Sequence, residues 1–180
     1  MAEFLPLEAL GPRIIVLGPT NSGKSTLADA MGRRSGIPVV HLDRLRHLPH
    51  TNWVERPDDE FKALHDEAVA TDAWIMDGAY SKLMPPRLAR VTGVLVVDAS
   101  LVVRMHRYLW RSLFQKRRAG GLDGDQDSVS WKMIKWLWKT RNKAAGTREF
   151  ARGIGVPCVF CHNQREVDRL YTHWGLNRVQ

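Results

Sequence analysis

The chain has 180 residues, of which 44% are hydrophobic and 26% charged, a profile typical of one soluble domain with a buried core. No run approaches the roughly 20 apolar residues of a membrane span, and the start lacks a basic segment followed by an apolar run, which argues against membrane insertion and secretion. With only two cysteines no disulfide framework is expected, and the prediction is a cytoplasmic protein with a single domain over 1–180.

The positive charge is concentrated in one part of the chain. The net charge is +8, and residues 101–152 hold 13 basic and 4 acidic side chains, whereas the remainder is close to neutral. Such a field suits polyanions, which include nucleotides, phosphorylated metabolites and nucleic acid. Charge alone does not choose among these ligands.

Short β-branched runs alternate with longer amphipathic stretches along the chain, a pattern typical of strands and helices in a parallel α/β fold. The predicted strands are 13–17, 38–42, 74–76, 94–97 and 157–160. The predicted helices begin near Lys24, Asp58, Ser100, Ser130 and Gln164. The interval 115–130 is rich in Gly, Asp and Arg without an apolar period, and we expect a loop there that acts as a lid.

The first strand runs directly into a phosphate-binding motif. Its residues fit the pattern G-x-x-x-x-G-K-[ST] and are followed by a helical segment. The predicted nucleotide-binding residues are Gly18, Pro19, Thr20, Asn21, Ser22, Gly23, Lys24, Ser25 and Thr26. Backbone N–H groups and the helix start would hold a triphosphate, with Lys24 on its β and γ phosphates and the Ser25 hydroxyl on Mg²⁺. The sequence therefore predicts ATP and Mg²⁺ as cofactors.

Three acidic residues follow predicted strands, at the edge where ligands bind in open α/β sheets. Asp77 precedes Gly78 and is the favoured Mg²⁺ carboxylate. Asp43 is predicted to orient or deprotonate an acceptor hydroxyl. For Asp98, a cap on the following helix is favoured over catalysis.

Arginines cluster on the helix that begins near Ser100. Arg104, Arg107 and Arg111 fall on one face. The opposite face is apolar and carries Val102, Leu109 and Leu113. Cationic groups around a transferring phosphate are the main catalytic asset of a phosphotransferase, so Arg107 and Arg111 are candidate catalytic residues, although a solvated basic face is an open alternative.

Two further patterns are given structural interpretations. The lysines of 132–143 lie beside tryptophans, which can stack bases of single-stranded nucleic acid, but packing is favoured for the tryptophans. The C-x-x-C-H segment 158–162 matches half of a zinc site or a haem-attachment site. Because it falls on a predicted strand without further ligands nearby, core cysteines are favoured. His41 is a single histidine with packing or surface as its default role.

From about Arg13 to about Thr140 the chain resembles the adenylate-kinase-like P-loop proteins of the bacterial DNA topology modulation group. The resemblance is carried by GPTNSGKST, VVHLD, NWVERPDDEF, WIMDGAYSKLMPPRLAR, VLVVDASLVVRMHRYLWR and WKMIKWLW. It implies a P-loop NTPase fold like that of nucleoside monophosphate kinases: a three-layer sandwich whose five-stranded parallel sheet has helices on both faces, with a lid.

The resemblance also implies roles for single residues. Asp77 would help to hold Mg²⁺, Arg107 would contact the adenine and Arg111 the phosphates. Asp43, Arg87 and Arg90 would face the acceptor. After Asp77-Gly78 the chain continues with Ala-Tyr-Ser, where adenylate kinases carry an aromatic-Pro-Arg sequence, so a true adenylate kinase is not expected.

The sequence thus predicts an ATP-dependent phosphotransferase that acts on a nucleotide or a small hydroxyl acceptor. An ATP-dependent nucleic-acid-binding regulator that influences DNA topology is the first alternative, and a nucleotide sensor with negligible turnover is the second. The acceptor, the base preference and the oligomeric state are left open.

Overall fold

The structure is a computed structural model that describes residues 4–51, 53–114, 131–140 and 143–178. Five parallel strands form one sheet in the order β2-β3-β1-β4-β5. The strands are β1 (Arg13–Leu17), β2 (Val39–His41), β3 (Trp74–Asp77), β4 (Gly93–Val97) and β5 (Cys158–Cys161). All five predicted strands are present: β1 has its predicted bounds, and the bounds of the other four differ by one residue.

The helices fill the connections between the strands. They are η1 (Leu7–Leu10), α1 (Lys24–Ser35), α2 (Leu42–Arg46), α3 (Asp58–Ala70), η2 (Ser81–Leu83), α4 (Met84–Leu88), α5 (Leu101–Phe114), α6 (Trp131–Lys139), α7 (Lys143–Gly153) and α8 (Gln164–His173). The predicted helical starts fit α1, α3, α5, α6 and α8. The helices α2, α4 and α7 were missed: the first two have five residues, too few to show a period, and α7 carries few apolar residues.

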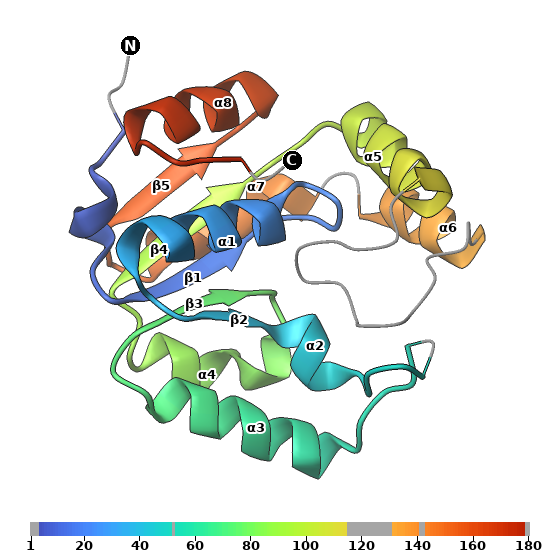
Figure 1. The fold of residues 1–180 in the computed structure, drawn as a ribbon, viewed down its shortest axis with the longest axis horizontal. Helices are drawn as coiled ribbons and strands as arrows, with labels where there is room; N and C mark the ends of the chain where they lie inside the picture. The colour runs from blue at the N-terminus through green and yellow to red at the C-terminus, as the bar shows by residue number, and fades with distance from the viewer. Residues whose placement is uncertain (1–3, 52, 115–130, 141–142, 179–180) are drawn as a thin grey trace.

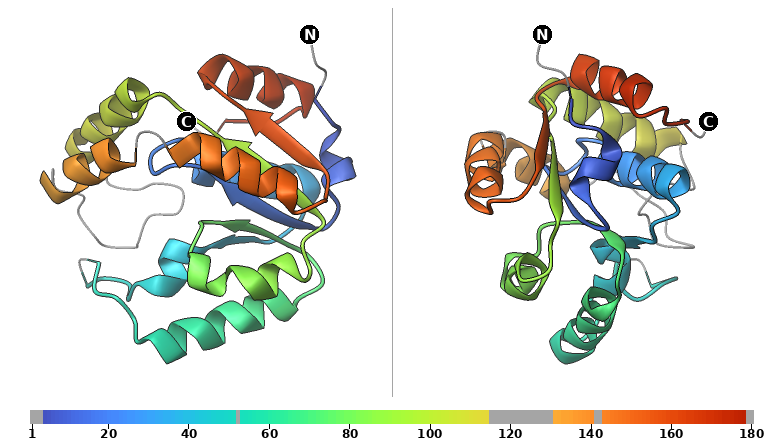
Figure 2. Two further views of the ribbon diagram at one scale, coloured as in Figure 1. Left: turned by 180° about the vertical axis from the view of Figure 1, so that it is seen from behind. Right: turned by 90° about the vertical axis from the view of Figure 1, so that its left-hand side faces the viewer.

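Two apolar layers cover the sheet. On one face, α1 and α8 pack Leu27 and Leu170 against alternate strand residues such as Ile14 and Val16. On the other face, α3, α4 and α7 cover Ile15 and its neighbours. Figure 2 shows the sheet edge-on with α4 and α7 on one side and α1 and α8 on the other. The predicted arrangement of helices on both faces is therefore confirmed.

Strand order brings the functional segments together. β1 lies between β3 and β4, so the chain must cross over β1 between those two strands, which makes the carboxyl end of β1 a topological switch point. The segments that follow β1, β2, β3 and β4 all emerge at one edge of the sheet, toward α2, α5 and α6 (Figure 1). None of the helices in the described ranges combines the length and apolar character needed to cross a bilayer.

The helices α5 and α6 expose aromatic residues. Leu137 is fully buried, but Trp131 and Trp138 are 77% and 61% exposed. The prediction that these tryptophans are packing anchors is therefore wrong for these two. The predicted lid, 115–130, lies outside the described residues.

Candidate active site

The phosphate-binding loop joins β1 to α1. Gly18 has a φ of 144°, and a Cβ there would lie 2.0 Å from the carbonyl oxygen of Val97, so only glycine fits beside β4. Gly23 has a φ of 98° and is the N-cap of α1. Lys24 begins this helix, and its Nζ donates a hydrogen bond to the carbonyl of Pro19, across the loop, at 3.1 Å. The local backbone is thus the concave turn into a helix start that binds anions.

Two arginines of α5 hold this loop from outside. Arg104 is almost fully buried, and its Nε donates to the carbonyl oxygen of Thr20 at 2.8 Å. Arg107 donates from Nη1 to the carbonyl oxygen of Ser22 at 2.7 Å. These two arginines therefore point toward the loop, and the predicted alternative of a solvated basic face does not fit them.

The apolar side of α5 is correspondingly exposed: Val102 is 77% and Leu109 40% exposed. Arg111 lies on α5 in the next turn, but its side chain is outside those that the structure describes. Its predicted contact with phosphate remains a prediction.

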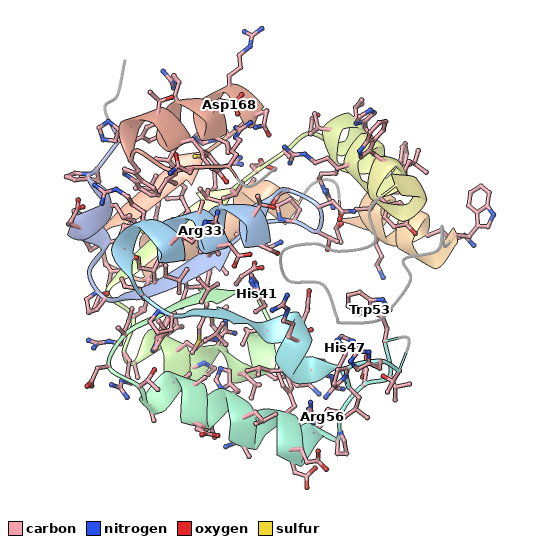
Figure 3. The ribbon with its side chains drawn as sticks, viewed as in Figure 1. Arg33, His41, His47, Trp53, Arg56 and Asp168 are labelled. Carbon is pink, nitrogen blue, oxygen red and sulfur yellow. The ribbon has the colours of Figure 1, made fainter. Side chains whose placement is uncertain are left out.

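A buried cluster of charge lies next to the loop, at the ends of β2 and β3. Asp77 is 7% exposed, and its Oδ2 lies 3.3 Å from Nδ1 of His41. The other ring nitrogen of His41, Nε2, lies 2.8 Å from Oδ1 of Asp29 on α1. Figure 3 shows His41 beneath α1, where β2 runs into α2. Sequence reasoning missed this cluster, because His41 has no partner close to it in the sequence.

Electrostatics keep this cluster charged. Burial opposes charge on His41, but the hydrogen bonds and charges of Asp29 and Asp77 outweigh it and raise the pKa of His41 to about 9. Burial likewise opposes ionisation of Asp77, but the His41 hydrogen bond, the Lys24 charge and the Ser25 hydroxyl together lower the pKa of Asp77. Asp77 is therefore a buried carboxylate that is ionised at neutral pH, as a magnesium ligand must be.

Asp43 lies on the same edge, in the first turn of α2, and its side chain is exposed. The hydroxyl of Tyr80 donates a hydrogen bond to Oδ1 of Asp43 at 2.6 Å. Tyr80 follows β3, three residues after Asp77, so its hydroxyl connects the predicted acceptor residue to the strand of the predicted metal residue. No motif pointed to Tyr80.

Arg87 is buried behind the segment that follows β3 and does not face an acceptor. It is fully buried, and its guanidinium donates hydrogen bonds to the carbonyls of Gly78 at 2.8 Å, of Tyr80 at 3.2 Å and of Ala79. Burial lowers the pKa of Arg87 to about 10. The guanidinium is thus committed to the backbone of the segment after β3, so the prediction that Arg87 binds the acceptor is wrong.

Arg90 lies at the opposite edge of the sheet. Its Nη1 donates to the carbonyl oxygen of Ala70, the last residue of α3, at 2.7 Å. Its own carbonyl accepts a hydrogen bond from Arg13, the first residue of β1. Because the phosphate-binding loop follows the carboxyl end of β1, the prediction that Arg90 faces the acceptor is also wrong.

Asp98 follows β4 and has a structural role. Its Oδ2 accepts a hydrogen bond from Arg148 on α7 at 2.9 Å, and its Oδ1 accepts from the backbone N–H of Ala99. The cap of α5 is instead Ser100, whose hydroxyl accepts from the backbone N–H of Val103 at 3.4 Å. The prediction that Asp98 caps this helix is therefore wrong.

The two cysteines lie on opposite faces of β5. Cys161 packs with the layer beneath α1 and α8, whereas Cys158 packs with the layer on the other face. Residues three apart on a strand point to opposite sides, so the two thiols cannot bind one metal ion. Among the described side chains no group of three or more His, Cys, Asp or Glu is arranged to hold a metal ion. The interpretation as core cysteines is confirmed.

Three buried polar atoms of the site have no hydrogen-bond partner among the described residues, and a nucleotide with its metal ion would supply these partners. Nδ2 of Asn21 and Oγ of Ser22 are buried in the loop and have no hydrogen-bond partner among the described residues. The same holds for Oδ1 of Asp77. Buried polar atoms without hydrogen-bond partners are unfavourable in free energy. The two groups of the loop can donate hydrogen bonds to a phosphate oxygen, and the carboxylate oxygen of Asp77 can accept from the water molecules of a hydrated cation. The loop would hold phosphates, and Ser25 with Asp77 would hold Mg²⁺.

The fold is similar to that of a solved kinase structure. A gluconokinase from Sinorhizobium meliloti 1021 is similar with a TM-score of 0.52 and 17% identity, over 92% of this chain and 91% of that chain. An unliganded sugar kinase from Janibacter sp. HTCC2649 gives a TM-score of 0.49 and 12% identity, over 92% and 95% of the two chains. No protein-family model and no curated protein sequence matches the chain. The likeness to the gluconokinase, at 17% identity, shows the fold alone, and the chain has the predicted α/β fold with a five-stranded parallel sheet.

Proposed function

We propose that this protein is a P-loop kinase that transfers the γ-phosphoryl group of ATP to a hydroxyl group of a small molecule. The observation that carries the proposal is the loop 18–26 with the ionised, buried carboxylate of Asp77 beside Ser25 and Lys24. A phosphate-binding loop next to a strand-end carboxylate is the arrangement that places a metal-bound triphosphate.

In this proposal each group at the nucleotide has one task. The backbone of 18–23 binds the phosphates, and Lys24 neutralises charge on the transferring group. Ser25 and Asp77 hold Mg²⁺, which when bound would neutralise charge on the β and γ phosphates. Arg107 holds the loop in shape through Ser22, and Arg111 of the next turn is proposed to contact phosphate.

The acceptor is proposed to bind at Asp43. An ionised carboxylate has several lone pairs, so Asp43 can accept the hydrogen bond from Tyr80 and another from a substrate hydroxyl. In that position it would orient the hydroxyl or take its proton during transfer. Arg87 and Arg90 bind backbone carbonyls of this chain. They were the two basic residues predicted at the acceptor side, so the sequence-based reason to expect a phosphate group on the acceptor no longer holds. We therefore favour an acceptor that is recognised by its hydroxyl groups over a nucleoside monophosphate.

The test is ADP release from ATP and Mg²⁺ across a panel of acceptors, with the Lys24→Ala variant as the control. The panel contains nucleoside monophosphates, sugars and sugar acids including gluconate, other hydroxylated metabolites, and DNA. We expect one hydroxylated class to stimulate release in the wild type and the Lys24→Ala variant to lose at least about 100-fold in rate. Undiminished transfer in a folded Lys24→Ala variant would contradict the assignment.

The DNA in this panel addresses the alternative of a nucleic-acid-binding regulator. One observation keeps it in the panel: Trp131 and Trp138 are exposed on α6, together with Lys135 and Lys139. A protein that binds several phosphates loses affinity steeply as salt rises, so binding is compared at low and physiological salt. Stimulation by DNA alone would replace the kinase proposal.

A further inference from the structure

A hydrogen-bonded bridge joins the two elements that carry the proposed metal-holding groups. His41 is 7% exposed and lies between Asp77 at the end of β3 and Asp29 on α1. The distances are 3.3 Å from Nδ1 to Asp77 Oδ2 and 2.8 Å from Nε2 to Asp29 Oδ1. The bridge therefore runs from strand to helix through one imidazole ring.

The backbone places both ends of this bridge. β2 pairs with β3 in parallel, and His41 lies beside Asp77 in the register of the two strands. Asp29 follows Ser25 by four residues on α1, so the two share one side of the helix, one turn apart. His41 thus connects the strand of Asp77 with the helix of Ser25.

The two carboxylate oxygens of Asp77 differ in their hydrogen bonds. Oδ2 is engaged by His41, whereas Oδ1 is buried without a hydrogen-bond partner among the described residues. The terminal torsion of an aspartate is soft, so without a partner the two oxygens would exchange readily. The contact with His41 fixes which oxygen remains available.

We propose that His41 is a positioning residue for the metal, which holds Oδ2 of Asp77 so that Oδ1 faces the hydrated cation at the nucleotide phosphates. This inference rests on the proposed function, because it requires that Asp77 serves a nucleotide-bound cation. Groups that orient metal-holding carboxylates affect metal affinity strongly, by about 10- to 100-fold when they are removed.

Two amide variants separate this role from simple packing. Asn carries its amide nitrogen about as far from the backbone as Nδ1, the nitrogen that faces Asp77. Gln carries its amide nitrogen about as far as Nε2, the nitrogen that faces Asp29. His41→Asn can therefore retain the bond to Asp77, whereas His41→Gln can retain only the bond to Asp29.

The measurement is the binding of Mn²⁺, by the loss of its free electron paramagnetic resonance signal, to protein saturated with a non-hydrolysable ATP analogue. Mn²⁺ prefers the same oxygen ligands as Mg²⁺. Nucleotide affinity without metal is measured in parallel. His65→Asn is the matched control, because His65 is also a buried histidine beside an aspartate, Asp66, but lies on α3.

We expect His41→Gln to weaken Mn²⁺ binding by about tenfold or more and His41→Asn by a smaller factor. Nucleotide affinity without metal and the His65→Asn variant should be close to the wild type. Asp29→Ala leaves His41 and Asp77 in place and removes the carboxylate that accepts the hydrogen bond from Nε2, so it should weaken Mn²⁺ binding in the same direction by about threefold. It also keeps the inference testable if His41→Gln does not fold.

Equal effects of the His41→Asn and His41→Gln variants, or unchanged Mn²⁺ affinity in folded His41→Gln or Asp29→Ala, would overturn the inference while the kinase proposal stands. A wild-type protein that binds no ATP analogue with or without metal would overturn the proposed function, and this inference with it. The two failures are thus distinguishable in one set of titrations.

Discussion

The hydroxyl of Tyr80 lies 2.6 Å from Oδ1 of Asp43 and joins the segments that follow β2 and β3. Tyr80 has a φ of 37°, in the left-handed region that non-glycine residues rarely adopt. Its ring packs edge-on against Phe61, and its carbonyl accepts a hydrogen bond from Arg87. Backbone strain of about 1–3 kcal/mol is retained where the surroundings enforce it, and such residues cluster at ligand-binding sites.

Removal of this hydroxyl should affect the acceptor and spare the nucleotide. Tyr80→Phe keeps the ring against Phe61 and deletes only the donor to Asp43. A hydrogen bond to a charged group contributes about 1.5–3 kcal/mol, and the exposure of Asp43 to water reduces this, so we expect kcat/KM for the acceptor to fall about tenfold. The affinity for ATP should stay within about twofold of the wild type. An equal loss in both parameters would show that Tyr80 supports the site as a whole.

Arg87 should contribute strongly to stability. Arg87→Met keeps most of the side-chain volume but removes the donors to Gly78, Ala79 and Tyr80. A fully buried carbonyl that loses its partner costs about 1–3 kcal/mol, and these three carbonyls are partly accessible to water, so we expect the free energy of unfolding in urea to fall by about 3 kcal/mol in total.

Arg90→Met is the matched control for this prediction. Arg90 has one hydrogen bond to Ala70 in an exposed setting, so its replacement should cost less than about 1 kcal/mol. Equal losses in the two variants would contradict the assignment of Arg87 as the brace of the segment after β3.

The phosphate-binding loop was predictable because its chemistry is local. Strand, glycines, Lys24 and helix follow one another in the sequence, and each position is fixed by a backbone requirement such as the contact of Gly18 with Val97. The five strands were predictable for a similar reason, since each is a short apolar run, and the three central strands β1, β3 and β4 are buried on both faces.

The rest of the site depends on contacts distant in sequence. Arg87 and Arg90 are only three residues apart, but Arg87 binds the segment after β3 and Arg90 lies at the opposite edge of the sheet. The direction of the helix α4 determines this difference, and a helix of five residues is too short to show an apolar period in the sequence. His41 meets Asp77 because β2 pairs with β3, and Asp29 because α1 crosses above. Strand order determines these contacts, and composition and spacing do not encode strand order.

The thiol of Cys161 should be inert in the folded protein. It is 1% exposed, and burial together with the charge of Glu166 raises the pKa of this thiol to about 12. Because the thiolate is the reactive form, we expect alkylation by iodoacetamide at pH 8 to be slower than in urea by about 100-fold or more. Mass spectrometry of the peptide that contains Cys161 gives the rate, and rapid labelling without denaturant would contradict its place in the core.

His65 should make the protein sensitive to mild acid. Its ring is fully buried, Nδ1 lies 3.1 Å from Oδ1 of Asp66, and Nε2 has no partner among the described residues. Burial lowers the pKa of His65, the charge of Arg87 acts in the same direction, and the hydrogen bond that His65 donates to Asp66 offsets only part of this. The folded state thus binds a proton less readily than the unfolded state, whose histidine has a pKa of about 6.5.

The sign of the pH dependence follows from this difference. Above pH about 6.5 both states are neutral at His65 and the contribution to stability is fully present, whereas below it the unfolded state takes up a proton that the folded state lacks. Stability should therefore fall toward pH 5 with a slope of up to about 1.4 kcal/mol per pH unit from this group. Urea unfolding at pH 7.5, 6.5 and 5.5 should give a shallower slope for His65→Asn than for the wild type. His106→Asn, which changes an exposed histidine on α5, should keep the wild-type slope, and identical slopes in all three proteins would assign the acid sensitivity to other groups.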